Sequence, residues 1–578
     1  MASRRFCLGG FADRIERHGI CMKIKRVMVA APKSGSGKTT VVCALLQMLK
    51  KEGLQVVSCK CGPDYIDPMF HEKAIQVPSK NLDTFFTGEE GTRELFASHV
   101  EHKDVAVLEG VMGLYDGLGG IREEGSSYHL AEVTGTPIVL VIDAKGMGNS
   151  LLPLVAGFLA YDKSRLIKGV VLNRVSKGYY ETIKPLLEQE FHIKVAGFLP
   201  ERAEYQIGSR HLGLVLPDEL EDIQKKLRAA SEEVSKTVSL GAIMEIAGSA
   251  GELEASKTDS FGAAAERAVI AVARDEAFCF YYADNIRLLE AYGAKISYFS
   301  PLRDEKLPEG CHALLIGGGY PELYAKELSG NSGIRAAVRQ AAASGMPIVA
   351  ECGGFMYLHS ALTDKEGARY EMAGVLPGTC FYTGKLVRFG YIQLQEKKGN
   401  FLPEGEFIKG HEFHYYDSTG NGADVTAIKP ATSREYPCVV EHGDCWMGFP
   451  HLYYPSNPAF AQAFVAKAEK YKEKMGRAGG AAPVGFMPGR SERNQEGHSH
   501  RFFENRACKY FPCHQGLERF NCLFCYCPLY PREACLGTPA FKEKDGKQLK
   551  ICTGCTFPHQ PENYDAVIKA LQGKPANG

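Results

Sequence analysis

Residues 24–40 read IKRVMVAAPKSGSGKTT, and this stretch decides the fold of the first half of the chain. An apolar run typical of a buried strand leads into a Gly/Ser-rich turn, PKSGSGKT at 32–39, and the helix-forming run TTVVCALLQMLKKEG starts at residue 39. A glycine-rich turn in this position is typical of a P-loop, whose backbone N–H groups and helix N-terminus surround phosphate oxygens. The stretch therefore predicts a nucleotide-binding α/β domain.

The residue types in the turn fit ATP binding. Lys38 is expected to reach the β- and γ-phosphates, and the Thr39 hydroxyl to hold Mg²⁺. The alternative is a turn that only caps a helix, and the strand, the glycines, the lysine and the threonine together argue against it. The motif departs from the usual pattern at its first position, which is Pro32 rather than glycine. The residues predicted to bind ATP are Lys33, Gly35, Gly37, Lys38, Thr39, Thr40 and Asn173, the last of which could hydrogen-bond the adenine.

Acidic residues follow two further strand-like runs. Asp64 and Asp67 come after LQVVSCK, and Glu109 and Asp116 lie in VAVLEGVMGLYDG. Because parallel strands end at one edge of a sheet, these carboxylates are expected in the same crevice as the P-loop. Mg²⁺ prefers oxygen ligands, so Asp64 and Glu109 are predicted to join Thr39 as magnesium ligands, and Asp67 and Asp116 to bind the substrate. Taken singly, each could instead be a solvated turn residue.

The alternation of apolar runs and helical stretches continues along the chain and predicts parallel sheets covered on both faces. It stops in a stretch rich in Gly, Ala and Ser, restarts at AVIAVARD, and closes with the helical run PAFAQAFVAKAEKYKEKM. The sequence thus predicts two α/β domains and a cysteine-rich tail. The predicted parts are an N-terminal extension (1–24), a P-loop domain (25–245), a linker (246–265), a second α/β domain (266–472), a linker (473–500) and a cysteine-rich module (501–572).

The composition excludes several classes of function. The chain has 578 residues, of which 45% are apolar, enough for more than one core. Its 68 Lys and Arg offset its 68 Asp and Glu, so there is no overall positive field to favour nucleic acid or a membrane surface. No apolar run has the length of a bilayer span, and the N-terminus does not resemble a secretory signal. We therefore expect a cytoplasmic protein whose cysteines are thiols, metal ligands or nucleophiles.

The second domain offers a candidate nucleophile. The run PIVAEC leads from a strand into Cys352, which Gly353-Gly354 and a helix follow, and a helix N-terminus favours the thiolate form of a cysteine. His451 is the predicted base, with His411 and His414 as competitors. Backbone N–H groups of Gly318 and Gly319 are predicted to form an oxyanion hole. A buried structural thiol is the alternative role of Cys352.

The tail is a different kind of segment. Two pairs of cysteines, each with two residues between its members and located at separate places in the chain, can together form a tetrahedral zinc site. The free energy of zinc binding would fold a short segment. One or two structural Zn²⁺ ions are therefore predicted, with an iron–sulfur cluster or reduced thiols as the alternatives. The predicted ligands are Cys508, Cys513, Cys522, Cys525, Cys527, Cys535, Cys552 and Cys555.

Several long strings carry a resemblance to a known family. They occur in the order SGSGKTT, GPDYIDP, NLDTFF, EGVMGLYDG, RHLGL, VARDEAFCFYY, GGGYPE, ECGG and GHEFHYY. Over roughly residues 25–470 the chain resembles the cobyrinic acid a,c-diamide synthases, which are glutamine-dependent amidotransferases of cobalamin biosynthesis. The resemblance implies a P-loop domain similar to dethiobiotin synthetase and a second domain of the class I glutamine amidotransferase fold.

The resemblance also implies a mechanism and site roles. ATP would phosphorylate a carboxylate of a cobyrinate-type tetrapyrrole, and ammonia released from glutamine by Cys352 and His451 would attack the acyl phosphate. The chain departs from the family pattern after His451, where Leu452-Tyr453-Tyr454 stands in place of Leu-His-Phe. No acidic residue lies two positions after His451, so a catalytic dyad is expected rather than the triad of typical class I glutaminases.

Some alternatives stay open at this level. The macrocycle could be hydrogenobyrinate or nickel-sirohydrochlorin rather than cobyrinate. A regulatory ATPase is an alternative of another class, because Lys33 stands where partitioning-type ATPases carry a signature lysine. Such a switch has no use for Cys352 and His451. The tail resembles a small cysteine-rich module found beside cobalamin biosynthesis enzymes, which makes those enzymes candidate partners. A second copy of the chain is another candidate partner, in a homodimer.

Overall fold

A computed structural model describes residues 19–201, 217–256 and 265–477, and in the tail residues 536, 538, 540–544, 547–551 and 555–571. The chain divides into two compact units, Met1–Gly480 and Ala481–Gly578, which are described separately.

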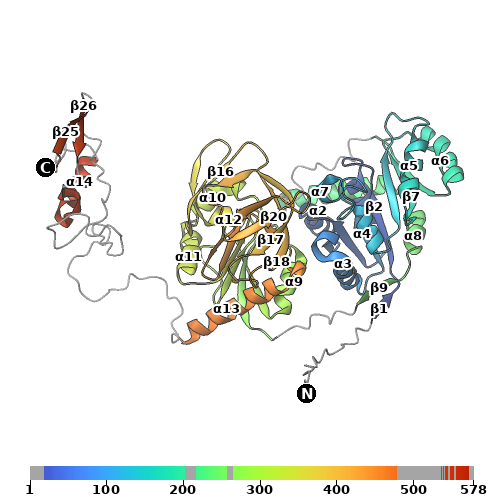
Figure 1. The fold of residues 1–578 in the computed structure, drawn as a ribbon. Helices are drawn as coiled ribbons and strands as arrows, with labels where there is room; N and C mark the ends of the chain where they lie inside the picture. The colour runs from blue at the N-terminus through green and yellow to red at the C-terminus, as the bar shows by residue number, and fades with distance from the viewer. Residues whose placement is uncertain are drawn as a thin grey trace, which may run out of the picture. The chain divides into compact units, whose positions relative to one another are not determined.

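The first domain, which contains α3, α5 and β7 of Figure 1, is built on a seven-stranded sheet. The strand order is β4-β3-β5-β2-β6-β7-β8, and every neighbouring pair is parallel. Its strands are β2 (Lys25–Ala30), β3 (Val56–Cys61), β4 (Ser79–Leu82), β5 (Val105–Glu109), β6 (Ile138–Asp143), β7 (Ile167–Asn173) and β8 (Lys194–Leu199). Its helices are α1 (Lys38–Lys51), α2 (Ile66–Phe70), η1 (His71–Ile75), α3 (Thr84–Val100), η2 (Leu118–Gly120), α4 (Ser127–Val133), α5 (Leu151–Tyr161), α6 (Lys177–Phe191), α7 (Pro217–Ser235) and α8 (Leu240–Gly248).

The sheet of the first domain is buried on both faces. Successive side chains of a strand point to opposite faces, and in β2 Met28 and Ala30 join one core while Val27 and Val29 join the other. This explains why the strands read as continuous apolar runs rather than as alternating ones. Because β2, β3 and β5 are neighbours, the loops that follow them meet at one edge of the sheet.

Two predicted irregular segments contain strands. Strand β1 (Gly19–Met22), in the predicted N-terminal extension, pairs antiparallel with β9 (Leu253–Ser256), in the predicted linker at 246–265. The predicted N-terminal extension (1–24) therefore contains a strand at Gly19–Met22. Each strand has only four residues, and the two strands lie more than 200 positions apart in the chain. Neither segment therefore carries a local signal for pairing.

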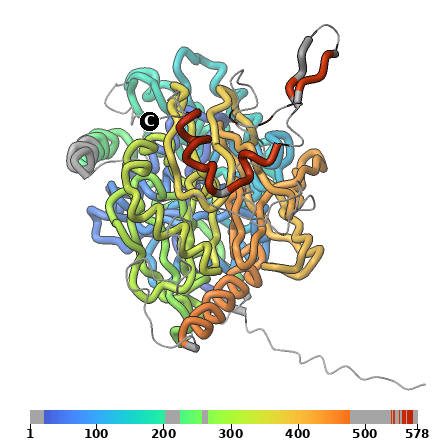
Figure 2. Tube along the Cα trace, turned by 90° about the vertical axis from the view of Figure 1, so that its left-hand side faces the viewer, coloured from blue at the N-terminus to red at the C-terminus, as the bar shows by residue number. Residues whose placement is uncertain are grey.

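The second domain is built on a six-stranded sheet with the order β11-β10-β12-β13-β23-β22, in which only β22 is antiparallel to its neighbour. These strands are β10 (Ala268–Ala273), β11 (Ala294–Phe299), β12 (Ala313–Ile316), β13 (Ile348–Glu351), β22 (Val440–His442) and β23 (Cys445–Gly448). The helices are α9 (Ala283–Ala291), η4 (Pro321–Tyr324), α10 (Ala325–Gly330), α11 (Ser332–Ala343), α12 (Gly353–Leu358), η5 (Tyr454–Ser456) and α13 (Ala459–Arg477), the last being the orange helix of Figure 2.

Two further sheets complete the second domain, a mixed one in which β14 and β16 are parallel, and one that is antiparallel throughout. One has the order β15-β14-β16-β19 and the other the order β21-β20-β17-β18-β24. The strands are β14 (His359–Thr363), β15 (Arg369–Glu371), β16 (Leu376–Tyr382), β17 (Arg388–Glu396), β18 (Phe407–His414), β19 (Tyr416–Ser418), β20 (Val425–Ile428), β21 (Glu435–Cys438) and β24 (His451–Leu452). Residues of β17 pack with α9 and α13 in one core of the domain.

The described part of the tail is small. It contains an antiparallel hairpin of β25 (Ala540–Lys544) and β26 (Lys547–Ile551), two short turns of helix, η7 (Phe557–His559) and η8 (Pro561–Asn563), and the helix α14 (Tyr564–Leu571). Among the helices of the described ranges, none combines the length and the hydropathy that crossing a bilayer requires.

Candidate active sites

The P-loop lies between β2 and α1, as predicted. Gly35 and Gly37 have φ values of 76° and 98°, in the left-handed region that favours glycine. A side chain on Gly37 would also collide with Asn173, because its Cβ would lie 2.4 Å from Asn173 Nδ2. That amide donates to the Ser36 carbonyl at 2.8 Å. Asn173 therefore braces the P-loop here, and its role toward adenine stays a prediction.

The two polar side chains that open α1 point into the crevice at the end of the sheet. Lys38 Nζ donates to the backbone carbonyl of Met112 at 2.6 Å, and Thr39 Oγ1 donates to Glu109 Oε1 at 2.7 Å. Thr40 follows them in the helix, and the Lys33 carbonyl accepts from Ser36 within the loop. The structure thus brings the predicted magnesium ligands Thr39 and Glu109 together.

The carboxylates of the crevice surround a buried lysine that sequence reasoning missed. Lys60 Nζ lies 2.5 Å from Asp67 Oδ2, 3.2 Å from Glu109 Oε1 and 3.9 Å from Asp64 Oδ2. Burial acts to lower the pKa of Lys60, but Glu109, Asp67 and Asp64 outweigh it and raise that pKa. A lysine among otherwise uncharged residues of β3 was the available signal. Three of the four predicted acidic residues, Asp64, Asp67 and Glu109, therefore surround the ammonium group of Lys60.

The cluster can accept a divalent cation. In the described structure Glu109 Oε2 is buried without a hydrogen-bond partner, and burial raises the pKa of this carboxyl group, so the group would gain from a cation. Its neighbour is His71 Nε2, at 3.5 Å. Oxygen donors from Thr39, Asp64 and Glu109 form the donor set that Mg²⁺ prefers.

Asp116 lies apart from this cluster, on the loop after β5. Its Oδ2 accepts from the Gly113 N–H at 2.9 Å, which fixes the loop. Its negative charge acts to raise the pKa of Lys38. Burial and the nearby charge of Lys60 outweigh the carboxylates, so the pKa of Lys38 is lowered overall. Asp116 is thus placed beside the expected phosphate position rather than on the metal ligands.

Cys352 occupies a strand-to-helix elbow in the second domain. It follows β13 directly, precedes α12, and has φ 48° and ψ −103°, an unusual conformation for a residue with a side chain. Its N–H donates to the Gly448 carbonyl at 2.8 Å, which ties the elbow to β23. A strained elbow that presents a side chain at a helix N-terminus is typical of a nucleophile.

His451 lies on β24, which begins three residues after β23, the strand to which the Cys352 elbow is tied. The Cβ of a side chain on Gly318 would lie 2.3 Å from His451 Cε1, so the imidazole lies directly over the Gly317–Gly319 turn. Its competitors have other contacts: His411 stacks on His451 with ring centroids 4.9 Å apart, and His414 Nδ1 is 2.7 Å from the Tyr416 carbonyl. This arrangement favours His451 as the base.

The turn at Gly318 and Gly319 lies beside the elbow. A Cβ on Gly319 would lie 2.1 Å from the Ala277 carbonyl, so only glycine fits there. The Gly319 nitrogen is in turn 3.2 Å from the position that a Cβ on Gly353 would take. The predicted oxyanion-hole residues are therefore adjacent to the residue that follows Cys352.

A carboxylate that the sequence did not single out faces His451. Glu351 Oε2 lies 3.9 Å from His451 Nδ1, a nitrogen that has no hydrogen-bond partner among the described residues. The Tyr454 hydroxyl donates to the other oxygen, Oε1, at 3.4 Å. Glu351 precedes Cys352 in the chain rather than following His451, so the sequence pattern of the usual triad does not indicate it.

Burial shifts the pKa values of Cys352, His451 and Glu351. Burial raises the pKa of the Cys352 thiol, and Glu322 adds to this effect. Burial also lowers the pKa of His451 to about 3 and raises that of Glu351 to about 8. Burial therefore favours the uncharged form of all three groups.

The two α/β domains meet in an aromatic cluster next to both sites. Tyr65, from the loop that carries Asp64, stacks on Phe280 with centroids 5.0 Å apart, and its ring lies 5.4 Å from that of His451. Elsewhere on the interface the Tyr391 hydroxyl donates to Asp83 Oδ2 at 2.7 Å.

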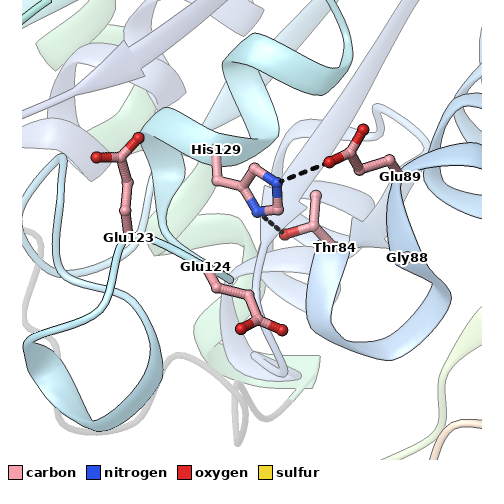
Figure 3. A pocket seen from close by; sticks show the side chains of 6 residues that line it. All are labelled: Thr84, Gly88, Glu89, Glu123, Glu124 and His129. Carbon is pink, nitrogen blue, oxygen red and sulfur yellow. Dashed lines mark hydrogen bonds and ion pairs between the residues drawn. The ribbon is translucent and has the colours of Figure 1, made fainter.

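A pocket of about 380 Å³ opens on the first domain (Figure 3). His129 binds Thr84 at 2.9 Å within it, and Glu89 approaches the other ring nitrogen at 3.7 Å. Three glutamates, Glu89, Glu123 and Glu124, line it. This lining disfavours an anionic substrate.

Of the predicted ligands in the tail, Cys508, Cys513, Cys522, Cys525, Cys527, Cys535 and Cys552 lie outside the described residues. Cys555 is described and is buried. Within the ranges that the structure describes, no three His, Cys, Asp or Glu side chains are grouped so that they alone could hold a metal ion.

Comparisons with known proteins agree with this geometry. Residues 27–215 match the CobQ/CobB/MinD/ParA nucleotide binding domain, residues 269–453 the CobB/CobQ-like glutamine amidotransferase domain, and residues 499–576 a cysteine-rich small domain. A nucleotide site joined to a glutaminase site defines the class: the protein is a glutamine-dependent amide ligase, and the predicted fold class is confirmed.

The relatives identify the family within this class. The chain is 39% identical to the cobyrinate a,c-diamide synthase of Caldanaerobacter subterraneus over 74% of its own length and 94% of the relative's. It is 38% identical to that of Listeria innocua, covering 75% and 98% of the two chains, and 36% identical to that of Thermoplasma volcanium, covering 78% and 99%. The chain belongs to the cobyrinate a,c-diamide synthase family.

Proposed function

We propose that this chain converts cobyrinate to cobyrinate a,c-diamide, using ATP to activate each carboxylate and glutamine to supply each nitrogen. The observation that carries the proposal is the placement of Tyr65, which links the loop of the ATP-site carboxylates to the ring of His451. A nucleotide switch would have no use for a nucleophile elbow beside this loop.

The chemistry requires both sites. Hydroxide is a poor leaving group, so the γ-phosphoryl group of ATP is transferred to a carboxylate oxygen, which gives ADP and an acyl phosphate. Ammonia then attacks the acyl carbon and inorganic phosphate leaves. Lys38 and the P-loop N–H groups bind the phosphates, and Asp67 and Asp116 border the acceptor position. Mg²⁺ held by Thr39, Asp64 and Glu109 would neutralise phosphate charge.

The second domain releases ammonia from glutamine. His451 takes the proton of the Cys352 thiol as the sulfur attacks the side-chain amide, and returns it to the departing ammonia. The backbone N–H groups of Gly318 and Gly319 stabilise the oxyanion, and water then hydrolyses the thioester to glutamate. Glu351 orients His451 through Nδ1, so the proposed site is a Cys-His-Glu triad assembled differently from the usual one. Production of ammonia in an attached domain limits its loss to solvent.

The cysteine-rich tail is proposed to hold one or two structural Zn²⁺ ions. The spacing of its eight cysteines and its match to a cysteine-rich small domain support this assignment. Metal analysis of the purified chain tests it, because about one or two equivalents of zinc support the proposal, whereas iron or an absence of metal contradicts it. A cytoplasmic location is proposed from the need for ATP, glutamine and a reduced Cys352.

The experiment that tests the substrate is a comparison of turnover. Purified protein with ATP, Mg²⁺ and glutamine is given cobyrinate, hydrogenobyrinate or nickel-sirohydrochlorin, and amides are identified by mass. The proposal expects the highest kcat/KM with cobyrinate and a product two amides richer. A higher kcat/KM for nickel-sirohydrochlorin would assign the chain to that alternative substrate.

A further inference from the structure

We propose that the macrocycle docks against an aromatic platform formed by Phe389, Phe413 and Tyr415 on the second domain. This inference rests on the proposed function, because it assigns the binding surface of that substrate. The occupant it specifies is a planar ring with apolar faces and carboxylates along its rim.

The platform is the outer end of a sheet face that already contacts the first domain. Strands β17 and β18 pair so that Tyr391 lies opposite His411 and Phe389 lies opposite Phe413. Side chains two positions apart in a strand point to the same face. The face therefore runs from the Tyr391–His411 pair to the Phe389–Phe413 pair, and on to Tyr415.

The inner pair on this face touches the ATP-site loop. The Tyr391 hydroxyl lies 3.7 Å from the position that a Cβ on Gly62 would take, and Gly62 begins the loop that carries Asp64. The His411 ring lies 5.7 Å from that of Tyr65 in the same loop. Two residues of a strand span about 6.8 Å, so the platform begins one such step from the residues that contact the loop.

The outer residues are exposed although they are aromatic. Phe389 is 61% exposed, Phe413 52% and Tyr415 42%. Their rings nevertheless contact one another, with centroids 5.6 Å apart for Phe389 and Phe413 and 5.8 Å for Phe413 and Tyr415. A contiguous exposed apolar surface of this kind marks a binding site more often than isolated exposed residues do. Flat rings also suit stacking against a macrocycle.

The charges beside the platform suit an anionic rim. Lys429 Nζ donates to the Phe389 carbonyl at 2.8 Å, and the Thr383 N–H donates to the Tyr415 carbonyl, which brings the loop with exposed Lys385 to the platform. Of the basic residues nearby, Arg388 and Lys429 form ion pairs with buried Glu412, whereas Lys385 and Arg434 are exposed, beside one exposed carboxylate, Glu435. The Glu-lined pocket of the first domain has the opposite character.

The test measures cobyrinate binding and kinetics with the full chain. The variant carries Phe389→Ser and Phe413→Ser, and the control carries Phe407→Ser, a 40% exposed residue at the other end of the same face of β18. We expect the double variant to raise the KM and Kd for cobyrinate at least tenfold, with the KM for ATP within twofold of wild type. The control should differ from wild type by less than twofold. Replacing both phenylalanines with tyrosine should keep the KM within about threefold.

The outcomes separate this inference from the proposed function. Wild-type protein that fails to bind cobyrinate contradicts the proposed function itself. If wild type binds cobyrinate and the folded double variant, judged by an unchanged unfolding midpoint, binds it equally well, the platform is wrong. A wild-type dimer that the double variant dissociates would overturn the inference in favour of a second copy of the chain.

Discussion

The phenol ring of Tyr65 lies 5.4 Å, centroid to centroid, from the imidazole ring of His451. Tyr65 follows Asp64 on the loop after β3, so a residue adjacent to a predicted magnesium ligand contacts the proposed base of the glutaminase. Ammonia released at Cys352 would therefore emerge beside the loop that borders the acyl phosphate. This relationship gives a structural reason for having both activities in one chain.

The Cys352→Ala variant is expected to separate the two nitrogen sources. Without the sulfur nucleophile, glutamine hydrolysis should fall by at least 10³-fold, because covalent catalysis is lost. Synthesis with ammonium salts should continue within a fewfold of wild type, since the ATP site is untouched. Glutamate release and amide formation are measured on the same preparation, and retained glutaminase activity would reject Cys352 as the nucleophile.

The Lys38→Ala variant is expected to give the converse result. Loss of a cation on the phosphates should remove amide formation with glutamine and with ammonia alike, by about 10²-fold or more. Hydrolysis of glutamine at Cys352 should persist. Normal synthesis with either nitrogen source would show that the P-loop does not bind the nucleotide that is consumed.

Glu351 is expected to position His451. The Glu351→Gln variant should lower the kcat for glutamine hydrolysis about 10- to 100-fold with little change in KM, while Glu351→Asp should recover part of the loss. Glu441→Gln is the matched control, because it alters another buried carboxyl group on β22 of the same sheet, and it should leave the kcat near wild type.

A spectroscopic readout keeps this role distinct from a structural one. Since burial raises the pKa of the Cys352 thiol, alkylation by iodoacetamide should be slow at pH 7 and accelerate as the pH rises. With glutamate bound, Glu351→Gln should have less thiolate absorbance near 240 nm than wild type. Identical pH profiles and kcat values for wild type and Glu351→Gln would eliminate the positioning role.

Asp284 is expected to hold the two α/β domains together in a pH-dependent way. Its carboxylate is buried and lies 3.0 Å from His99 Nε2 of the first domain. Burial acts to raise the pKa of Asp284, but His99 outweighs it and lowers that pKa to about 2. The stabilisation is therefore present above the unfolded pKa of 3.8 and is lost as the pH falls through about 2.

The Asp284→Asn variant tests this pair. Breaking a buried pair by removing one charge typically costs about 3–5 kcal/mol, so its unfolding midpoint at pH 7 should be several degrees lower than that of wild type. The difference should shrink as the pH approaches 2. Glu290→Gln, an exposed change on the same helix α9, should have little effect. A deficit that is the same at pH 7 and at pH 2 would assign the effect to packing.

Local patterns predicted much of the fold. Strand-length apolar runs and the turn around Lys38 depend on neighbours in the chain, so the main sheet of each α/β domain and the P-loop could be predicted. The pairing of β1 with β9 could not, because it joins short segments far apart in the sequence. Lys60 and Glu351 were missed for a related reason: each acts through residues that only the folded chain brings near it.

The central claim is that nitrogen freed at Cys352 reaches a carboxylate activated in the first domain. The most direct test supplies glutamine labelled with ¹⁵N in the side-chain amide, together with cobyrinate, ATP, Mg²⁺ and excess unlabelled ammonium at a pH where most of it is protonated. The account predicts that mass spectrometry finds ¹⁵N in most of the new amides at the a and c positions. Amides that carry only unlabelled nitrogen, or no amide at all, would contradict it.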